Sequence, residues 1–229
     1  MLFRSCDTNF CRVPMGPVTA QRIADFYGCT MPTRKLVDNI YKHAEIKLAP
    51  VTYYPVGNNN EKVEKFIEHD EAIDEQFLAA GGELGQMVGG TKKDVIISNK
   101  ITDPSRDHHV VIYGWHQLNG VPIQPLYNGH FNYYVDYSHG IRLLKNDIQV
   151  DGERKFIRQI LRDPELYKLL SDENGIMVQP TYIFDSDFPR KPQSFGVKSL
   201  DSNRIKIVIN PAPDAEIHHL YTSKYGLSF

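Results

Sequence analysis

The segment HFNYYVDYSHGIRLL, residues 130–144, carries the side chains best suited to acid–base chemistry. Asp136 and His139 are three residues apart, and Ser138-His139-Gly140 is typical of a turn at the end of a strand. Such a turn brings carboxylate and imidazole into hydrogen-bond reach, which fixes the histidine tautomer and raises its basicity. We therefore predict His139 as a general base, Asp136 as the residue that orients it, and Arg142 as the holder of an anion or developing oxyanion.

A structural interpretation of these residues stays open, in which Asp136 caps the turn, His139 is an ordinary polar residue and Arg142 pairs with an acid. If residues 130–137 are extended, their side chains alternate between two faces. Phe131, Tyr133, Val135 and Tyr137 then form the core face, and His130, Asn132, Tyr134 and Asp136 form the other. On a straight strand His130 and Asp136 would be about 20 Å apart, too far to share one metal ion.

Residues near this segment are candidates for binding a substrate. We expect the cleft to be lined by Trp115, His116, His130, Tyr134 and Ser138. Other polar clusters are interpreted as solvated. They are His108-His109, His218-His219, Lys92-Lys93-Asp94 and the acidic outer face of a helix expected over 61–80.

The hydrophobic pattern predicts the elements that must position these side chains. Helices are expected over 17–27, from an N-cap at Thr33 to about 44, and over 61–80 with a stop at Gly81-Gly82. From residue 90 the residue types favour strands, first over 93–99 and 109–117.

Asn119-Gly120 predicts a hairpin with a two-residue type I′ turn, which places Leu118 opposite Val121 and His116 opposite Ile123. Pro122 and Pro125 predict an edge strand over 121–127, because proline donates no ladder hydrogen bond. Helices near 153–171, the second capped by Asp163, and strands near 176–184 and 204–210 complete the pattern.

These elements predict an α+β fold with a helical N-terminal third packed on a mainly antiparallel β-sheet, and further helices after the central strands. We expect one domain over 1–229. Its helical part covers about 17–82, its β-rich part about 90–150 and 176–210, and its later helices about 153–171.

Composition excludes several classes of protein. With 41% hydrophobic and 24% charged residues the chain is globular rather than disordered. A net charge of −2 without a long basic run argues against a nucleic-acid partner. No apolar stretch reaches the length of a membrane span, so we expect a soluble protein. The start, MLFRSCDTNFCRV, is too polar for a signal peptide; if it is a processed end, the compartment is hidden.

Motifs for cofactors and metals are missing from the sequence. Cys6, Cys11 and Cys29 lack CxxC spacing and are interpreted as ordinary reduced residues, with a Cys6–Cys11 bridge as the alternative. There is no G-x-S-x-G, P-loop, H-E-x-x-H or G-x-G-x-x-G motif, so no cofactor and no metal ligand set is predicted. The oligomeric state stays open.

Two resemblances add to this. The stretch SHGIRL, with His130 upstream, is similar to the L,D-transpeptidase signature S-H-G-C-[IV]-R, but no cysteine stands between Gly140 and Ile141, so that family's nucleophile is missing. The wider pattern resembles an uncharacterised bacterial protein family. It covers most of residues 12–175 through RVPMGPVTAQRIAD, MPTRKLVDNIY, KKDVIISN, IYGWH, NGVPIQPL, YVDYSHGIRLL and LRDPELYKLLSDENG. This resemblance implies a bacterial globular domain, exported if its N-terminus is processed, without an assigned reaction.

Two functions follow as hypotheses. The first is a hydrolase-type enzyme that acts on a small-molecule, peptide or glycan substrate, such as bacterial cell-wall material, through Asp136 and His139. The alternative is a non-catalytic carbohydrate- or peptide-binding module whose tyrosine-rich strand and Trp115 stack on the ligand. Catalysis requires Asp136 and His139 within hydrogen-bond reach inside a concavity, whereas a binding platform requires exposed, coplanar rings. A metal-dependent site is a third possibility, for which no ligands can be named.

Overall fold

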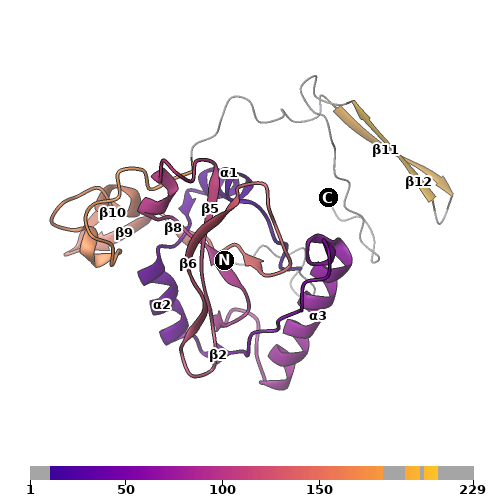
Figure 1. The fold of residues 1–229 in the computed structure, drawn as a ribbon, viewed down its shortest axis with the longest axis horizontal. Helices are drawn as coiled ribbons and strands as arrows, with labels where there is room; N and C mark the ends of the chain where they lie inside the picture. The colour runs from indigo at the N-terminus through magenta and orange to yellow at the C-terminus, as the bar shows by residue number, and fades with distance from the viewer. Residues whose placement is uncertain (1–10, 183–193, 202–203, 211–229) are drawn as a thin grey trace. The chain divides into compact units, whose positions relative to one another are not determined.

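The computed structural model describes residues 11–182, 194–201 and 204–210 (Figure 1). The chain, which we expected to form one domain, divides by its internal contacts into Met1–Tyr182 and Ile183–Phe229, and each unit is described by itself. Helices combine with antiparallel and mixed sheets, so the predicted α+β class is confirmed. No helix in the described part of the chain is both long and apolar enough to cross a bilayer.

The three N-terminal helices lie where the sequence predicts them. They are α1 (Pro17–Phe26), α2 (Arg34–His43) and α3 (Val63–Ala79), with a short 3-10 turn η1 (Asn59–Glu61) before α3. The hydroxyl of Thr33 accepts a hydrogen bond from the Leu36 amide at 3.3 Å, which confirms the predicted N-cap of α2. The predicted stop of α3 is also confirmed.

A four-stranded mixed sheet forms the centre of the first unit, in the order β6-β5-β4-β7. Its strands are β4 (Lys93–Val95), β5 (His109–His116), β6 (Pro122–Phe131) and β7 (His139–Gly140). Strand β7 runs parallel to β4 and the other pairs are antiparallel. The expected edge position of the proline-bearing strand is confirmed, and two register shifts in β6 make it irregular.

Both faces of this sheet are covered. Ala20 and Ala24 of α1 pack with Val95 and Ile112, whereas Val37 of α2 packs against the alternate residue Ile96. A third cluster joins Phe66 of α3 to Trp115 and Tyr137. Figure 1 shows α2 and α3 on either side of the β5–β6 hairpin.

The turn of this hairpin differs from the prediction. His116 pairs with Pro122 rather than Ile123, and the Gly120 amide donates to the Gln117 carbonyl at 2.8 Å. Only Gly120 in the turn has a positive φ, of +85°, so Asn119 does not adopt the conformation that a type I′ turn requires. The turn is instead closed one residue earlier, with glycine in the left-handed position that follows a type I turn.

Residues 130–137 do not form a continuous strand, so the predicted alternation of their side chains between two faces is wrong. Strand β6 ends at Phe131, and residues 132–138 form turns. Tyr133, predicted for the core, is 75% exposed, while Asp136, predicted for the open face, is buried. The backbone bends because Tyr134 donates to the Phe131 carbonyl at 3.0 Å and Tyr137 donates to Asn60 at 2.9 Å instead of to a neighbouring strand.

The region after the sheet is also partly different from the prediction. Residues 153–156, expected as helix, form β10 (Glu153–Phe156), which pairs with β9 (Asp147–Val150) through a two-residue Asp151-Gly152 turn with φ of 52° and 84°. Only short helical turns follow, α4 (Ile157–Ile160) and η3 (Tyr167–Leu169). Asp163 does cap its turn, because its Oδ1 accepts from the Glu165 amide at 2.8 Å.

The remaining strands are short. In the first unit β1 (Cys29–Thr30) pairs with β8 (Leu144–Lys145), and β2 (Ile46–Lys47) runs parallel to β3 (Val88–Gly89). A 3-10 turn, η2 (Asn99–Thr102), follows β4. No strand forms over 176–182, which corrects that prediction, and residues 183–184 lie outside the described residues. The second unit contains the antiparallel pair β11 (Ser194–Asp201) and β12 (Arg204–Asn210), so the predicted strand over 204–210 is confirmed.

Candidate active site

Parallel pairing of β4 with β7 brings the predicted catalytic residues to a buried lysine. Lys93 is in register with His139, and its amide donates to the Ser138 carbonyl at 3.0 Å. Residues in register on neighbouring strands direct their side chains to the same face of a sheet. Lys93 and His139 therefore lie side by side, and Asp136 lies on the connection between β6 and β7.

The Asp136 carboxylate contacts five donor groups. Its Oδ1 lies 3.0 Å from His139 Nδ1, 2.8 Å from the Ser138 amide and 2.5 Å from the Ser138 hydroxyl. Its Oδ2 lies 3.0 Å from Lys93 Nζ and 3.2 Å from the Tyr134 hydroxyl. Burial acts to raise the pKa of Asp136, but His139, Lys93 and Ser138 outweigh it and hold that pKa well below its usual range. The carboxylate stays ionised, and it both caps the turn and orients the imidazole.

Two groups of Asp136 meet Nδ1 of His139: the amide donates toward it over 3.2 Å, and the carboxylate lies 3.0 Å from it. An unprotonated Nδ1 would accept from the amide but turn its lone pair toward the anionic carboxylate. A protonated Nδ1 donates to that ionised oxygen, which is the stronger bond, so we assign the proton to Nδ1. Burial lowers the pKa of His139 against the opposing effect of Asp136, which keeps the ring neutral. Nε2 then bears a lone pair, and no described residue hydrogen-bonds to it.

Two half-buried rings form the outer layer of this cluster. Tyr134 packs edge-on against His139 with ring centroids 5.8 Å apart, and His130 stacks on Tyr134 at 4.3 Å. Burial raises the pKa of Tyr134, and the neighbouring carboxylate adds to this, so its hydroxyl is a donor. Burial and the Lys93 charge lower the pKa of His130. The predicted residues His130, Tyr134, Ser138, Asp136 and His139 are thus brought together, but the imidazole is fully buried.

Arg142 does not join them. Its Nε lies 3.5 Å from Asp94 Oδ1, and its guanidinium donates to the Val88 carbonyl at 3.3 Å. This is the acid pairing of the structural interpretation. Burial raises the pKa of Asp94, and Arg142 opposes that shift.

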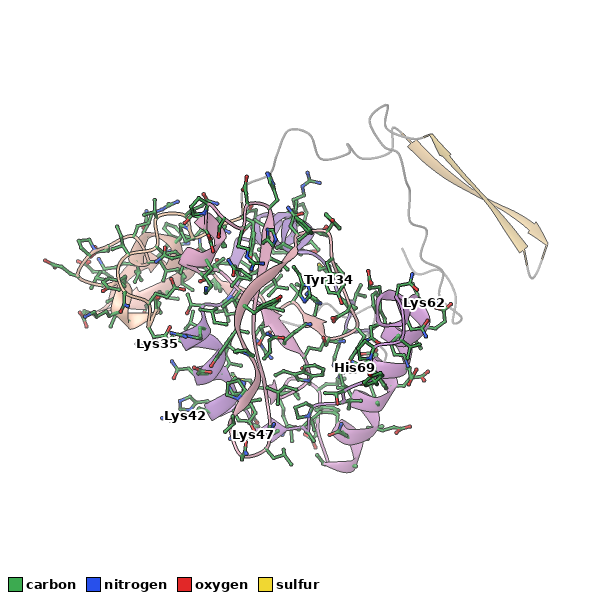
Figure 2. All side chains as sticks on the ribbon, viewed as in Figure 1. Lys35, Lys42, Lys47, Lys62, His69 and Tyr134 are labelled. Atoms are coloured by element: carbon green, nitrogen blue, oxygen red, sulfur yellow. The ribbon has the colours of Figure 1, made fainter. Side chains whose placement is uncertain are left out.

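Lys92, Lys93 and Asp94 are not solvated as predicted, since each is only 6% exposed. Lys92 Nζ donates to the Tyr137 carbonyl and lies 2.9 Å from Nδ1 of His69, whose Nε2 lies 3.1 Å from the Val51 carbonyl. Burial lowers the pKa of Lys92 to about 8 and, with the Lys92 charge, that of His69 to about 3. Figure 2 shows His69 on α3. His69 and the neighbouring Asp70 are buried, so the polar residues of this helix are not all solvated.

Trp115 and His116 lie in two different environments, and neither shares a cleft with His139. Trp115 has a φ of +55° and packs in the core with Phe66 and Tyr137. His116 Nε2 lies 2.8 Å from Asp38 Oδ1, in a pocket of about 440 Å³ between α2 and the β5–β6 hairpin.

Two pockets in the described part of the chain lie away from the Asp136–His139 pair. Neither the Asp38 pocket nor a pocket of about 410 Å³ lined by Arg34, Lys100 and Asp172, among others, is lined by Asp136 or His139. Beside the pair, Phe131 and Tyr133 are 50% and 75% exposed, and their rings stack with centroids 5.4 Å apart and an angle of 5° between their planes. These rings are exposed as a binding platform requires, but they are stacked rather than coplanar.

Sequence reasoning missed three contributors: Lys93, Asp38 and the Lys92–His69 pair. Three charged residues that lead directly into the apolar run VII signal a buried ion pair for Lys93. Asp38 has no local signal, because its partners are more than seventy residues away. His108 is exposed as expected, whereas His109 is half-buried at the start of β5, and His218-His219 lie outside the described residues.

No group of three or more His, Cys, Asp or Glu side chains in the described part of the chain is arranged to hold a metal ion. Cys11 and Cys29 are free thiols, and Cys6 lies outside the described residues. Comparisons of the chain with protein-family models, curated proteins and solved structures gave no match. A function must therefore be argued from the geometry alone.

Proposed function

We propose that the chain is a hydrolase-type enzyme that acts on a polar polymer or peptide, such as bacterial cell-wall material, with Asp136 and His139 as its acid–base pair. One observation carries the proposal. An ionised carboxylate holds Nδ1 of a neutral imidazole at 3.0 Å and leaves Nε2 without a partner among the described residues. This is the arrangement of a general base whose tautomer is fixed by an acid.

Each residue of the cluster has a role in this proposal. Nε2 of His139 takes a proton from the water that attacks the scissile carbon, and Asp136 stabilises the imidazolium that forms. The imidazolium then gives this proton to the leaving group as its bond to that carbon breaks, which returns His139 to the neutral state. Lys93 keeps Asp136 ionised. Because His139 is fully buried, the Tyr134 and His130 rings must move aside when the substrate enters, and they exclude bulk water at other times. Arg142 has no role in this mechanism, because its guanidinium pairs with Asp94.

The test is a screen for hydrolysis of peptidoglycan, chitin oligosaccharides and peptides, followed by variants in the responding assay. We expect His139→Ala and Asp136→Asn to lower kcat by about 10²–10⁴-fold, the usual contribution of a positioned acid or base. His43→Ala, at an exposed histidine in the last turn of α2, is the matched control and should retain full activity. A His139→Ala protein with a native circular dichroism spectrum and undiminished activity would end the proposal.

A second candidate function, a non-catalytic glycan- or peptide-binding module, is favoured by the exposed, nearly parallel rings of Phe131 and Tyr133. Co-sedimentation with insoluble chitin or peptidoglycan tests it. If Phe131→Ala/Tyr133→Ala abolishes sedimentation, His139→Ala does not, and no substrate is hydrolysed, the module is supported over the enzyme. Full sedimentation of the double variant would exclude this platform.

A further inference from the structure

We infer a second ligand site, in the pocket between α2 and the β5–β6 hairpin, which binds a hydroxylated anion: a sugar that carries a carboxylate or a phosphate. The pocket measures about 440 Å³, within the usual range of small-molecule sites. It is lined by Asp38, Tyr41, Lys42, Lys47, Tyr113, His116, Leu118, Asn119, Gly120 and Pro122. None of these belongs to the Asp136 cluster, so the inference is independent of the proposed hydrolase.

Asp38 is the only acidic residue in the lining. Hydrogen bonds to one of its two carboxylate oxygens hold its side chain in place. Oδ1 accepts from the Tyr113 hydroxyl at 2.9 Å and from His116 Nε2 at 2.8 Å. Burial and the bond to Asp38 raise the pKa of Tyr113, so its hydroxyl stays a donor. No described residue donates to Oδ2, and the side chain is 45% exposed, so a ligand can reach this oxygen. Oδ2 is therefore a positioned acceptor for sugar hydroxyls.

The rim of the pocket is basic. Lys42 and Lys47 are both exposed, and Lys47 Nζ lies 3.3 Å from the Lys42 carbonyl, which places its ammonium at the end of α2. Figure 2 shows Lys42 and Lys47 on the same side of the unit. Two ammonium groups beside one carboxylate leave the lining with a net positive charge, which favours a ligand that carries an anion as well as hydroxyls.

Rigid rings form the base of the pocket. Tyr41 and His116 stack with centroids 4.5 Å apart and an angle of 14° between their planes. The Tyr41 hydroxyl donates to the Gln117 carbonyl at 2.6 Å, which ties the stack to the hairpin. Leu118 and Pro122 add apolar contact. Because Tyr41 and His116 are only 7% and 4% exposed, they fix the shape of the pocket, and the apolar surface open to a sugar ring is that of Leu118 and Pro122.

Isothermal titration of the full chain tests the inference with four probes: D-glucuronate, D-glucose 6-phosphate, D-glucose and inorganic phosphate. We expect one or both acidic sugars to bind at least about tenfold more tightly than glucose, which lacks the anion. The same difference is expected from inorganic phosphate, which lacks the sugar hydroxyls. The carboxylate and phosphate sugars show which anion the site prefers.

Two variants separate the two halves of the site. Asp38→Asn keeps an oxygen for Tyr113 and His116 but replaces the free acceptor, and should weaken both acidic sugars about tenfold without changing phosphate. Lys42→Ala/Lys47→Ala should reduce the acidic sugars to the affinity of glucose. Lys62→Ala/Lys145→Ala removes the same charge outside the pocket and should change nothing. Equal affinity for glucose, phosphate and the acidic sugars, no binding at all, or unchanged affinity in both pocket variants would overturn the inference.

Discussion

At the scale of single residues, Asp136 shows how one carboxylate can satisfy both interpretations of the sequence. It caps the turn through Ser138 and orients His139, and its remaining oxygen accepts from Lys93 and Tyr134. The Lys93–Asp136 ion pair is nearly inaccessible to water. Breaking a buried pair from one side leaves an uncompensated charge, which costs more than the pair itself contributes.

We therefore predict that Lys93→Met lowers the free energy of unfolding by about 3–5 kcal/mol, as measured by urea denaturation. Lys93→Met/Asp136→Asn should recover a large part of that loss, because no buried charge is then left alone. Asp172→Asn, which removes the partially exposed ion pair with Arg34, should cost no more than about 1 kcal/mol. A Lys93→Met loss as small as that control would refute the buried pair.

Lys92 predicts a dependence of stability on alkaline pH. Its pKa falls from 10.5 in the unfolded chain to about 8 in the folded protein. Between these values the unfolded chain binds more protons than the folded one, so stability contributed at this site rises with pH from about 8 toward 10.5. Lys92→Met should remove this rise, seen as a difference between the two unfolding curves against pH. Identical slopes in both proteins would contradict the prediction.

At the scale of elements, the pairing of β3 with β2 brings Gly90 close to the backbone of Leu48. Gly90 has a φ of +87°, and a Cβ there would stand 2.1 Å from the Leu48 carbonyl oxygen. We predict that Gly90→Ala destabilises the protein by about 2 kcal/mol or more, because the clash adds to the cost of the left-handed backbone. Gly28→Ala, with a φ of +63° and no atom within 4 Å of the added carbon, isolates the backbone cost and should lose only about 1 kcal/mol.

Elements with a local signal could be predicted from the sequence, and elements set by distant partners could not. The cap at Thr33, the glycines after α3 and the prolines of β6 act within a few residues. The Asp151-Gly152 turn has the same kind of local signal, and the predicted helix is wrong at residues 153–156, which form β10. By contrast, the alternating residues 130–137 fit a strand equally well. Their bend depends on the turn at Tyr134 and on the distant contact of Tyr137 with Asn60, which the alternation does not reveal.

The same division applies to the candidate site. The closeness of Asp136 and His139 follows from their spacing and a turn, so the sequence was sufficient to predict it. The positions of Lys93, Arg142 and His116 depend on strand pairing and on acids far along the chain, which no short pattern reveals.

At the scale of the whole molecule, buried histidines make the fold sensitive to acid. His69 has a pKa near 6.5 when unfolded and about 3 when folded, so the unfolded chain takes up a proton first. Stability from this site is complete above about 6.5 and declines as pH falls toward 3. We predict a steady loss of unfolding free energy over that range in urea titrations, and a shallower loss in His69→Gln. A slope unchanged by the substitution would assign the acid sensitivity to other groups.

The buried charges at the start of β4 also affect how the protein is made. Their partners include Asp136 and Arg142, so β4 emerges from the ribosome well before these residues do. Translation at about 5–20 residues per second makes that interval last several seconds. Throughout it, Lys92, Lys93 and Asp94 remain hydrated on the strand that will become central, and charges on an open strand discourage pairing with other nascent chains. We therefore expect the residues that stabilise the finished sheet also to reduce aggregation at its unfinished edge.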